Sequence, residues 1–159
     1  MFRKALLAAL MIITGGGLTV TAVSGTAVAS TSACPVSAVI EIAHFAFNPA
    51  TVSPGQSSTA TLTAVNCTDQ SQQTSETWSG RFVGLSTGIP PGCPVIDPIA
   101  FAVTFPPNGT VSTSETYLVP PSCTATQLIV TANIYGKSGE LYAHGTATLN
   151  ITQLPVQST

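Results

Sequence analysis

The sequence predicts an all-β fold, and three features of its composition and patterning support this prediction. Threonine, valine and isoleucine, which favour strands, recur along the chain, whereas Leu, Glu, Lys and Gln form no helical repeat. Twelve prolines and thirteen glycines interrupt the 159 residues and leave little room for helices. Several short stretches alternate apolar and polar residues with a period of two, which is typical of half-buried strands.

Residues 1–29 have the organisation of a secretory signal peptide. Arg3 and Lys4 precede a short apolar run, and the triplet Ala27-Val28-Ala29 provides a small-residue cleavage site. We therefore expect an exported, extracellular chain that consists of residues 30–159. An uncleaved membrane anchor stays open as an alternative because the leader is long enough to cross a bilayer, although its glycines and hydroxyl residues weaken that interpretation.

The exported chain has 130 residues, which suffice for one domain. It carries two basic and six acidic residues, for a formal net charge of −4. Such a chain is expected to repel nucleic-acid phosphates, so we expect no nucleic-acid partner. No cofactor motif is present, and we expect a single domain over residues 30–159 that uses no cofactor.

Seven strands are expected in this domain, each bounded by turn residues. Pro-Gly, Asn-Pro and Asn-Gly pairs separate the alternating stretches and supply the turns. The predicted strands are, in order, Val39–Phe47, Ser58–Asn66, Ser75–Leu85, Ile99–Phe105, Thr110–Val119, Gln127–Tyr135 and Glu140–Ile151.

The last two strands are predicted to form a hairpin through a four-residue loop, Gly136–Gly139. One face of the hairpin is apolar and is expected to be buried. Its members are Leu128, Val130, Ala132, Ile134, Leu141, Ala143, Ala147, Leu149 and Ile151. The loop length predicts three cross-strand pairs on the outer face, namely Tyr135 with Glu140, Asn133 with Tyr142, and Thr131 with His144.

The seven strands, their alternating patterns and a single tryptophan on the third strand resemble secreted bacterial immunoglobulin-like domains. The tryptophan is Trp78, and the resemblance covers roughly residues 36–151. It implies a seven-stranded immunoglobulin-like antiparallel β-sandwich with Trp78 in its core. The cysteine pair that usually links the second and sixth strands of such domains is absent here.

Four cysteines in an exported domain predict two disulfides, which can be paired in three ways. Strand direction selects among them in a sandwich whose strands alternate up and down. Cys34, before the first strand, and Cys67, after the second, lie at one end. Cys93, after the third strand, and Cys123, before the sixth, lie at the other. We therefore predict the pairs Cys34–Cys67 and Cys93–Cys123, and no metal site, because the Cys and His spacings are too wide.

The outer face of the last hairpin is a candidate binding surface, because Tyr and Arg are common anchors of protein interfaces. The residues expected to share this face are Arg81, Asn133, Tyr135, Tyr142 and His144. The alternative is that these aromatic residues merely pack laterally on a half-wet sheet. Elsewhere, Glu76 is expected to be a solvated strand-face charge, Tyr117 to lie in the core and His44 to be partly buried.

Three classes of function remain open. The favoured one is a non-enzymatic binding or adhesion module whose partner is a protein or polysaccharide at the cell surface or in the medium. The second is an inhibitor of a secreted enzyme that presents the proline-stiffened loop Gly88–Pro98. The third is a small hydrolase, since Gly84–Gly88 reads G-x-S-x-G around Ser86 and is followed by Asp97 and His144. The prolines after this motif exclude the helix that a nucleophile elbow needs.

Overall fold

The computed structural model describes residues 34–85 and 87–153, which form strands and loops. The expected leader, residues 1–29, and Ser86 lie outside the described residues. A search of the described part for a helix that could span a membrane finds none. The strands are β1 (Ile40–Asn48), β2 (Thr51–Val52), β3 (Ser57–Asn66), β4 (Gln72–Val83), β5 (Ile99–Phe105), β6 (Thr110–Leu118), β7 (Gln127–Gly136) and β8 (Leu141–Ile151).

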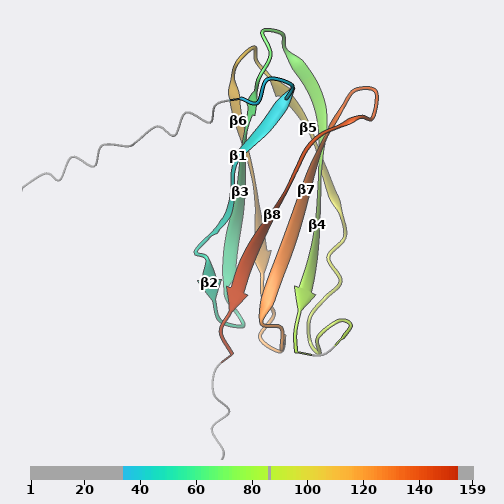
Figure 1. Cartoon of the computed structure of the whole chain (residues 1–159). Coiled ribbons are helices and arrows are strands. Elements are labelled where there is room, and N and C mark those ends of the chain that lie inside the picture. The colour runs from blue at the N-terminus through green and yellow to red at the C-terminus, as the bar shows by residue number, and fades with distance from the viewer. Residues whose placement is uncertain (1–33, 86, 154–159) are drawn as a thin grey trace, which may run out of the picture. The chain divides into compact units, whose positions relative to one another are not determined.

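Two sheets face each other and form an immunoglobulin-like sandwich (Figure 1). One sheet has the order β1-β3-β6 and the other has the order β2-β8-β7-β4-β5. The predicted fold class is confirmed, but the count of seven strands is wrong by one. After β1 the chain crosses to the second sheet, where β2 pairs with the end of β8 in parallel, while every other pairing is antiparallel.

The inner faces of the two sheets form one core, and the alternation read from the sequence places its residues correctly on β5 and β7. The even-numbered residues Leu128–Ile134 of β7 are completely buried. Trp78 on β4 is also buried, as the resemblance implied, and the ring of Phe45 from the opposite sheet packs edge-on against it at 5.0 Å between centroids. Tyr117 lies in the core as predicted and packs against Phe47.

The five-stranded sheet is wider than the three-stranded sheet that covers it. At one flank β1 and β8 lie close together, but at the other flank β5 and β6 do not approach each other in this way. The chain that leads into β5 fills part of this gap. Ile96 packs against Gly80 of β4, where an added Cβ would come within 3.0 Å of the Ile96 side chain. The absence of a side chain at Gly80 therefore makes room for Ile96.

Both predicted disulfides, Cys34–Cys67 and Cys93–Cys123, are present and lie at opposite ends of the sandwich. Near the first disulfide, the buried amide of Asn66 donates to the carbonyl oxygens of Gln70 at 2.7 Å and Pro106 at 2.9 Å. The Asn66 side chain therefore ties the β3–β4 turn to the β5–β6 turn, so the Cys34 end is held by polar contacts as well as by a covalent bond.

The hairpin between β7 and β8 has a register different from the predicted one. Asn133 lies opposite His144, whereas the sequence predicted Tyr142 at that position. One residue of this two-residue shift comes from the turn, and the other comes from a bulge in which Tyr142 is an extra residue on β8.

The turn of this hairpin is also tighter than predicted. Gly136 and Glu140 close it through a hydrogen bond of 2.8 Å from the Gly136 amide to the Glu140 carbonyl. Gly139 adopts a φ of 88°, which glycine tolerates and which is usual at the last position of a three-residue hairpin loop. Leu141 is 52% exposed beside the turn, so its expected place on the buried face is wrong.

The core contains a carboxyl group, that of Glu76 on β4, and the expectation that it is solvated is wrong. Glu76 shares the inner face of β4 with Trp78. Its Oε1 accepts hydrogen bonds from Nε1 of Trp78 and, at 2.5 Å, from Oγ1 of Thr113. Thr113 belongs to β6, so this contact joins the two sheets. The second oxygen of Glu76, Oε2, has no hydrogen-bond partner in the described part of the chain.

We expect the substitution Glu76→Leu to lower the free energy of unfolding by about 2 kcal/mol, because two donors then lose their acceptor. Glu76→Gln retains a carbonyl oxygen in a side chain of the same shape and should lose much less. Urea unfolding followed by Trp78 fluorescence measures both values. An equal loss in the two variants would contradict the role assigned to this hydrogen bond.

Burial, and secondarily the Glu115 carboxylate, raises the pKa of Tyr117 from 10.0 to about 12. The unfolded chain loses this proton near pH 10 while the folded chain retains it. The free energy of unfolding should therefore fall as the pH rises from 10 towards 12, by at most about 1.4 kcal/mol per pH unit for one group. The fall should be shallower in Tyr117→Phe, as measured by unfolding at several pH values in this range, and an unchanged slope would refute the assignment.

Candidate functional site

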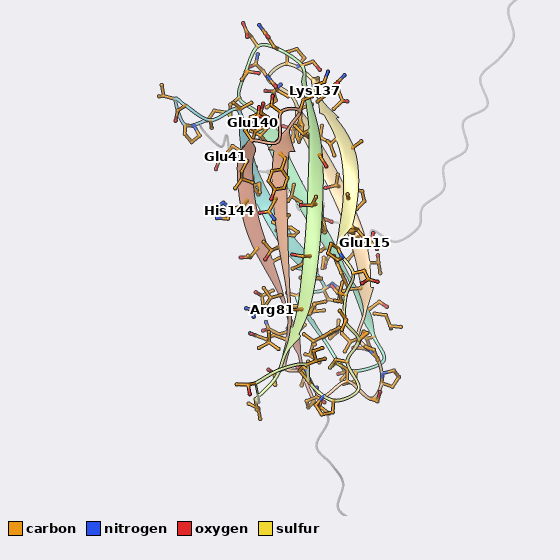
Figure 2. The ribbon with its side chains drawn as sticks, turned by 90° about the vertical axis from the view of Figure 1, so that its right-hand side faces the viewer. Glu41, Arg81, Glu115, Lys137, Glu140 and His144 are labelled. Carbon is orange, nitrogen blue, oxygen red and sulfur yellow. A yellow bond between two sulfur atoms is a disulfide. The ribbon has the colours of Figure 1, made fainter. Side chains whose placement is uncertain are left out.

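The structure divides the predicted binding surface on the outer face of the five-stranded sheet. Asn133 and His144 are direct cross-strand neighbours, and Tyr135 lies two residues closer to the hairpin turn. Arg81 is exposed on the same face but pairs with Ile129, four residues or about 13 Å along the strands from Asn133. Figure 2 shows Arg81 and His144 well separated along the sheet.

Tyr142 leaves the outer face because of the bulge in β8. Its ring lies against Gly136, and a Cβ on Gly136 would come 2.4 Å from Cζ of the ring. The Tyr142 hydroxyl donates to Oε1 of Glu140 at 2.7 Å. This hydrogen bond is the main reason why the pKa of Glu140 is lowered and the pKa of Tyr142 is raised. Of the five predicted residues, only Asn133, Tyr135 and His144 therefore remain together on the outer face of the sheet.

A groove of about 590 Å³ opens between β1 and β8 and was not anticipated from the sequence. It brings His44 of β1 and His144 of β8 to the same place, together with Glu41 and Tyr142. His44 is exposed, not partly buried as expected. The two histidines are far apart in the sequence, and only the adjacency of the first and last long strands at one flank could have signalled this. No group of three or more His, Cys, Asp or Glu residues suited to a metal ion occurs among the described residues.

The connection between β4 and β5, residues 84–98, carries a concentration of exposed apolar side chains. Leu85 is 100% exposed, Val95 is 71% exposed and Ile89 is 63% exposed. These are three of the six large apolar residues that are exposed in the described part of the chain, and the other three lie on separate elements. Exposed apolar side chains that gather on one segment are typical of interaction surfaces.

The middle of this connection is fastened to the β6–β7 loop. The Cys93–Cys123 disulfide joins the two segments covalently. Beside it, the backbone amide of Thr124 donates to the carbonyl of Pro91 at 3.0 Å, and the Thr124 hydroxyl donates to the same oxygen at 3.2 Å. The disulfide is therefore supported by two hydrogen bonds, which together hold the backbone between Ile89 and Val95.

Close backbone packing further restricts the connection. Gly92 has a φ of 72°, and a Cβ at this position would lie 2.0 Å from the carbonyl oxygen of Ser122. Any other residue would force the two loops apart, so the brace depends on glycine here. Further along the connection, the partly buried Ile96 packs against the core at Gly80. The segment is thus fixed both at its middle and near its end.

The residues of the hydrolase alternative do not come together. Asp97 lies two residues before β5, at one edge of the five-stranded sheet. His144 lies on β8, and β4 and β7 run between the two. The described residues that follow the G-x-S-x-G motif form a turn and irregular chain, with no helix. The arrangement that the motif would require is therefore not present in the described part of the chain.

No protein-family model and no curated protein matches the sequence. Among solved structures, the chain is similar to part of the Pseudomonas fluorescens alkylpurine DNA glycosylase AlkC bound to DNA containing an abasic site analogue, with a TM-score of 0.51, 16% identity and 72% of this chain covered. It is also similar to part of a Paenibacillus cycloisomaltooligosaccharide glucanotransferase, with a TM-score of 0.51, 12% identity and 70% coverage. A third similar structure is the Bacillus subtilis sporulation control protein Spo0M, with a TM-score of 0.50, 12% identity and 74% coverage.

The chain spans only 31%, 14% and 51% of the lengths of these three proteins, respectively. At such low identities the similarity concerns the fold alone. It agrees with the sandwich described above and assigns no ligand or reaction to this chain.

Replacing Cys93 and Cys123 together by Ser should lower the free energy of unfolding by about 3 kcal/mol, because the disulfide joins residues 30 positions apart. The connection should also become more accessible to chymotrypsin at Leu85. Limited proteolysis with mass spectrometry measures the cleavage rate. The matched control replaces Cys34 and Cys67, which should cost similar stability without faster cleavage at Leu85. Equal rates in the two double variants would show that the Cys93–Cys123 bond does not brace this segment.

Proposed function

We propose that the domain is an exported, non-enzymatic binding module that holds a protein partner on its β4–β5 connection. The observation that carries this proposal is the exposure of Leu85, Ile89 and Val95 on one braced segment. Full burial of such a side chain against a partner is favourable by about 1.5–3 kcal/mol. A backbone that is already ordered loses less conformational entropy on binding, so more of this free energy appears as affinity.

Export is supported by two independent features. The leader motif in residues 1–29 is of the type that export systems recognise. The two disulfides are of the kind that persists in an oxidising environment. The partner we propose is accordingly a protein at the cell surface or in the medium.

Inhibition of a secreted enzyme is a second candidate function, and it uses the same surface. Within the loop Gly88–Pro98, the disulfide at Cys93 and the partly buried Ile96 hold the backbone, while Ile89 and Val95 project outward. A fixed loop with projecting side chains fits the cleft of an enzyme without needing to reorganise. An inhibitor would slow a secreted hydrolase at stoichiometric concentration, whereas an adhesion module would bind without that effect.

Adhesion through the outer face of the sheet is less well supported. Only Asn133, Tyr135 and His144 remain together there, and Tyr135 is the single aromatic residue among them. Polysaccharide recognition usually uses aromatic side chains as stacking surfaces, so this face offers one such platform. The following experiment distinguishes a polysaccharide ligand bound at Tyr135 from a protein partner bound at the β4–β5 connection.

Selection of peptides from a displayed library against the folded domain tests the proposal. Peptides that bind the wild-type domain should bind the double variant Leu85→Ser, Ile89→Ser at least tenfold more weakly, because two apolar anchors are lost. The matched control is Leu141→Ser, which removes an exposed leucine from another element and should leave binding unchanged. Titration calorimetry or surface plasmon resonance provides the affinities.

Peptides that bind the double variant as well as the wild type would refute the connection as the binding surface. Co-sedimentation with cell walls, chitin and cellulose is measured in parallel. Depletion that is lost in Tyr135→Ser and retained in the double variant would assign the function to the sheet face and to a polysaccharide ligand.

A further inference from the structure

The free strand edges of the sandwich are mostly protected against pairing with other strands. A bulge between Ile42 and His44 interrupts β1, and a second bulge at Tyr142 interrupts β8. Strand β6 carries the charged residue Glu115. Bulges and charged side chains are the devices by which natural sheets keep their edges from adding a further strand.

Strand β5 has none of these protective features. It is the last strand of the five-stranded sheet and pairs with β4 from Gln72 to Trp78 without a break in register. Its sequence from Ile99 to Phe105 contains no charged residue, no proline and no glycine. Uninterrupted and uncharged edges of this kind are templates for the addition of a strand.

The free side of β5 has unused hydrogen-bonding capacity. The side-chain contacts of its backbone come from the β4 side, where the hydroxyls of Ser71 and Thr74 donate to the carbonyls of Phe105 and Val103 at 3.1 Å each. On the opposite side, no backbone hydrogen bond reaches β5 from any described residue. In an antiparallel sheet, alternate residues of an edge strand direct both their N–H and C=O groups to that side.

We propose that β5 pairs with β5 of a second copy of this chain, in antiparallel orientation, to form a continuous ten-stranded sheet across a two-fold axis. The strand is complementary to itself. When pairing is centred on Ala102, Ile99 lies opposite Phe105 of the second copy and Phe101 lies opposite its Val103. Each apolar residue of the inner face then meets another apolar residue, as an isologous interface requires.

Size and charge favour β5 of the second copy, rather than another of its strands, as the strand that pairs with this edge. The outer-face residues of β5 are Ala100, Ala102 and Thr104, which are small, uncharged and exposed, so two copies can approach without collision or repulsion. A β6 edge would bring Glu115 to the interface. On the inner face, Ile99 and Phe101 are only half-buried at the open flank, and the second copy covers them.

An interface formed by one strand of seven residues is smaller than that of a permanent dimer. The association is therefore weak and depends on concentration. We expect a folded monomer at low protein concentration and a dimer at high concentration, with no change in the fold of either copy.

Sedimentation velocity of the folded domain, with its disulfides intact, from about 10 μM to about 1 mM tests this proposal. The weight-average mass of the wild type should rise towards twice the monomer value. The variant Ala102→Lys places a charge beside its own copy across the two-fold axis and should stay monomeric. The matched control Ala43→Lys puts the same charge on an exposed alanine of the β1 edge and should associate like the wild type.

Two further measurements keep the outcome decisive. The Trp78 fluorescence spectrum verifies that each variant is folded. Hydrogen exchange at low and high concentration should show that added protection of amides is confined to Ile99–Phe105. A wild type that remains monomeric at the highest concentration, an Ala102→Lys variant that still associates, or protection that appears on β1 or β6 instead would each overturn the proposal.

Discussion

The architecture depends on a mismatch in width, because a five-stranded sheet is covered by a sheet of only three strands. The two sheets meet closely where β1 and β8 run side by side, and the surplus width falls on the opposite flank. Chain from outside the sheets must shield the core there, which explains the inward position of Ile96 and the glycine that admits it. The hydrogen bond from Thr113 to Glu76 ties the narrow sheet to the wide one beside this flank. Both the β4–β5 connection and the unpaired edge of β5 lie at this flank, which the three-stranded sheet leaves uncovered.

Much of the fold could be predicted because its determinants are local or follow from strand direction. Alternation with a period of two identified the long strands, and their up-and-down order was enough to select the disulfide pairs. The hairpin register could not be predicted, because the bulge at Tyr142 has no sequence signature that separates it from a regular strand. The burial of Glu76 was not predicted, although the sequence contains a signal for it. It stands two residues from Trp78 and therefore on the same face of β4, but carboxyl groups are seldom buried and this overrode the pattern.

The candidate sites were harder to predict than the strands, since they depend on which segments meet across the fold. A surface on adjacent strands is sensitive to register, so the bulge in β8 removed Tyr142 from the five residues predicted to share one face, while Arg81 lies apart because it pairs with Ile129. The proposal for the loop Gly88–Pro98 started from its prolines and Cys93, which can be read directly from the local sequence. The exposure of Leu85 could not be inferred, because apolar residues in a strand-rich sequence are expected in the core. The groove that joins His44 and His144 required knowledge that the first and last long strands lie at one flank.

The two described ends of the chain, near residues 34 and 153, leave the sandwich at opposite ends, and this determines how the domain would carry tension. A pull on these ends acts along β1 and β8, in the direction of the strands. The ladder hydrogen bonds run across the strands, so they bear the load together in shear and do not open one after another. The Cys34–Cys67 bond passes part of the load directly to the end of β3, which prevents β1 from sliding away. Such a domain resists extension much better than one whose terminal strands are peeled apart from the same end.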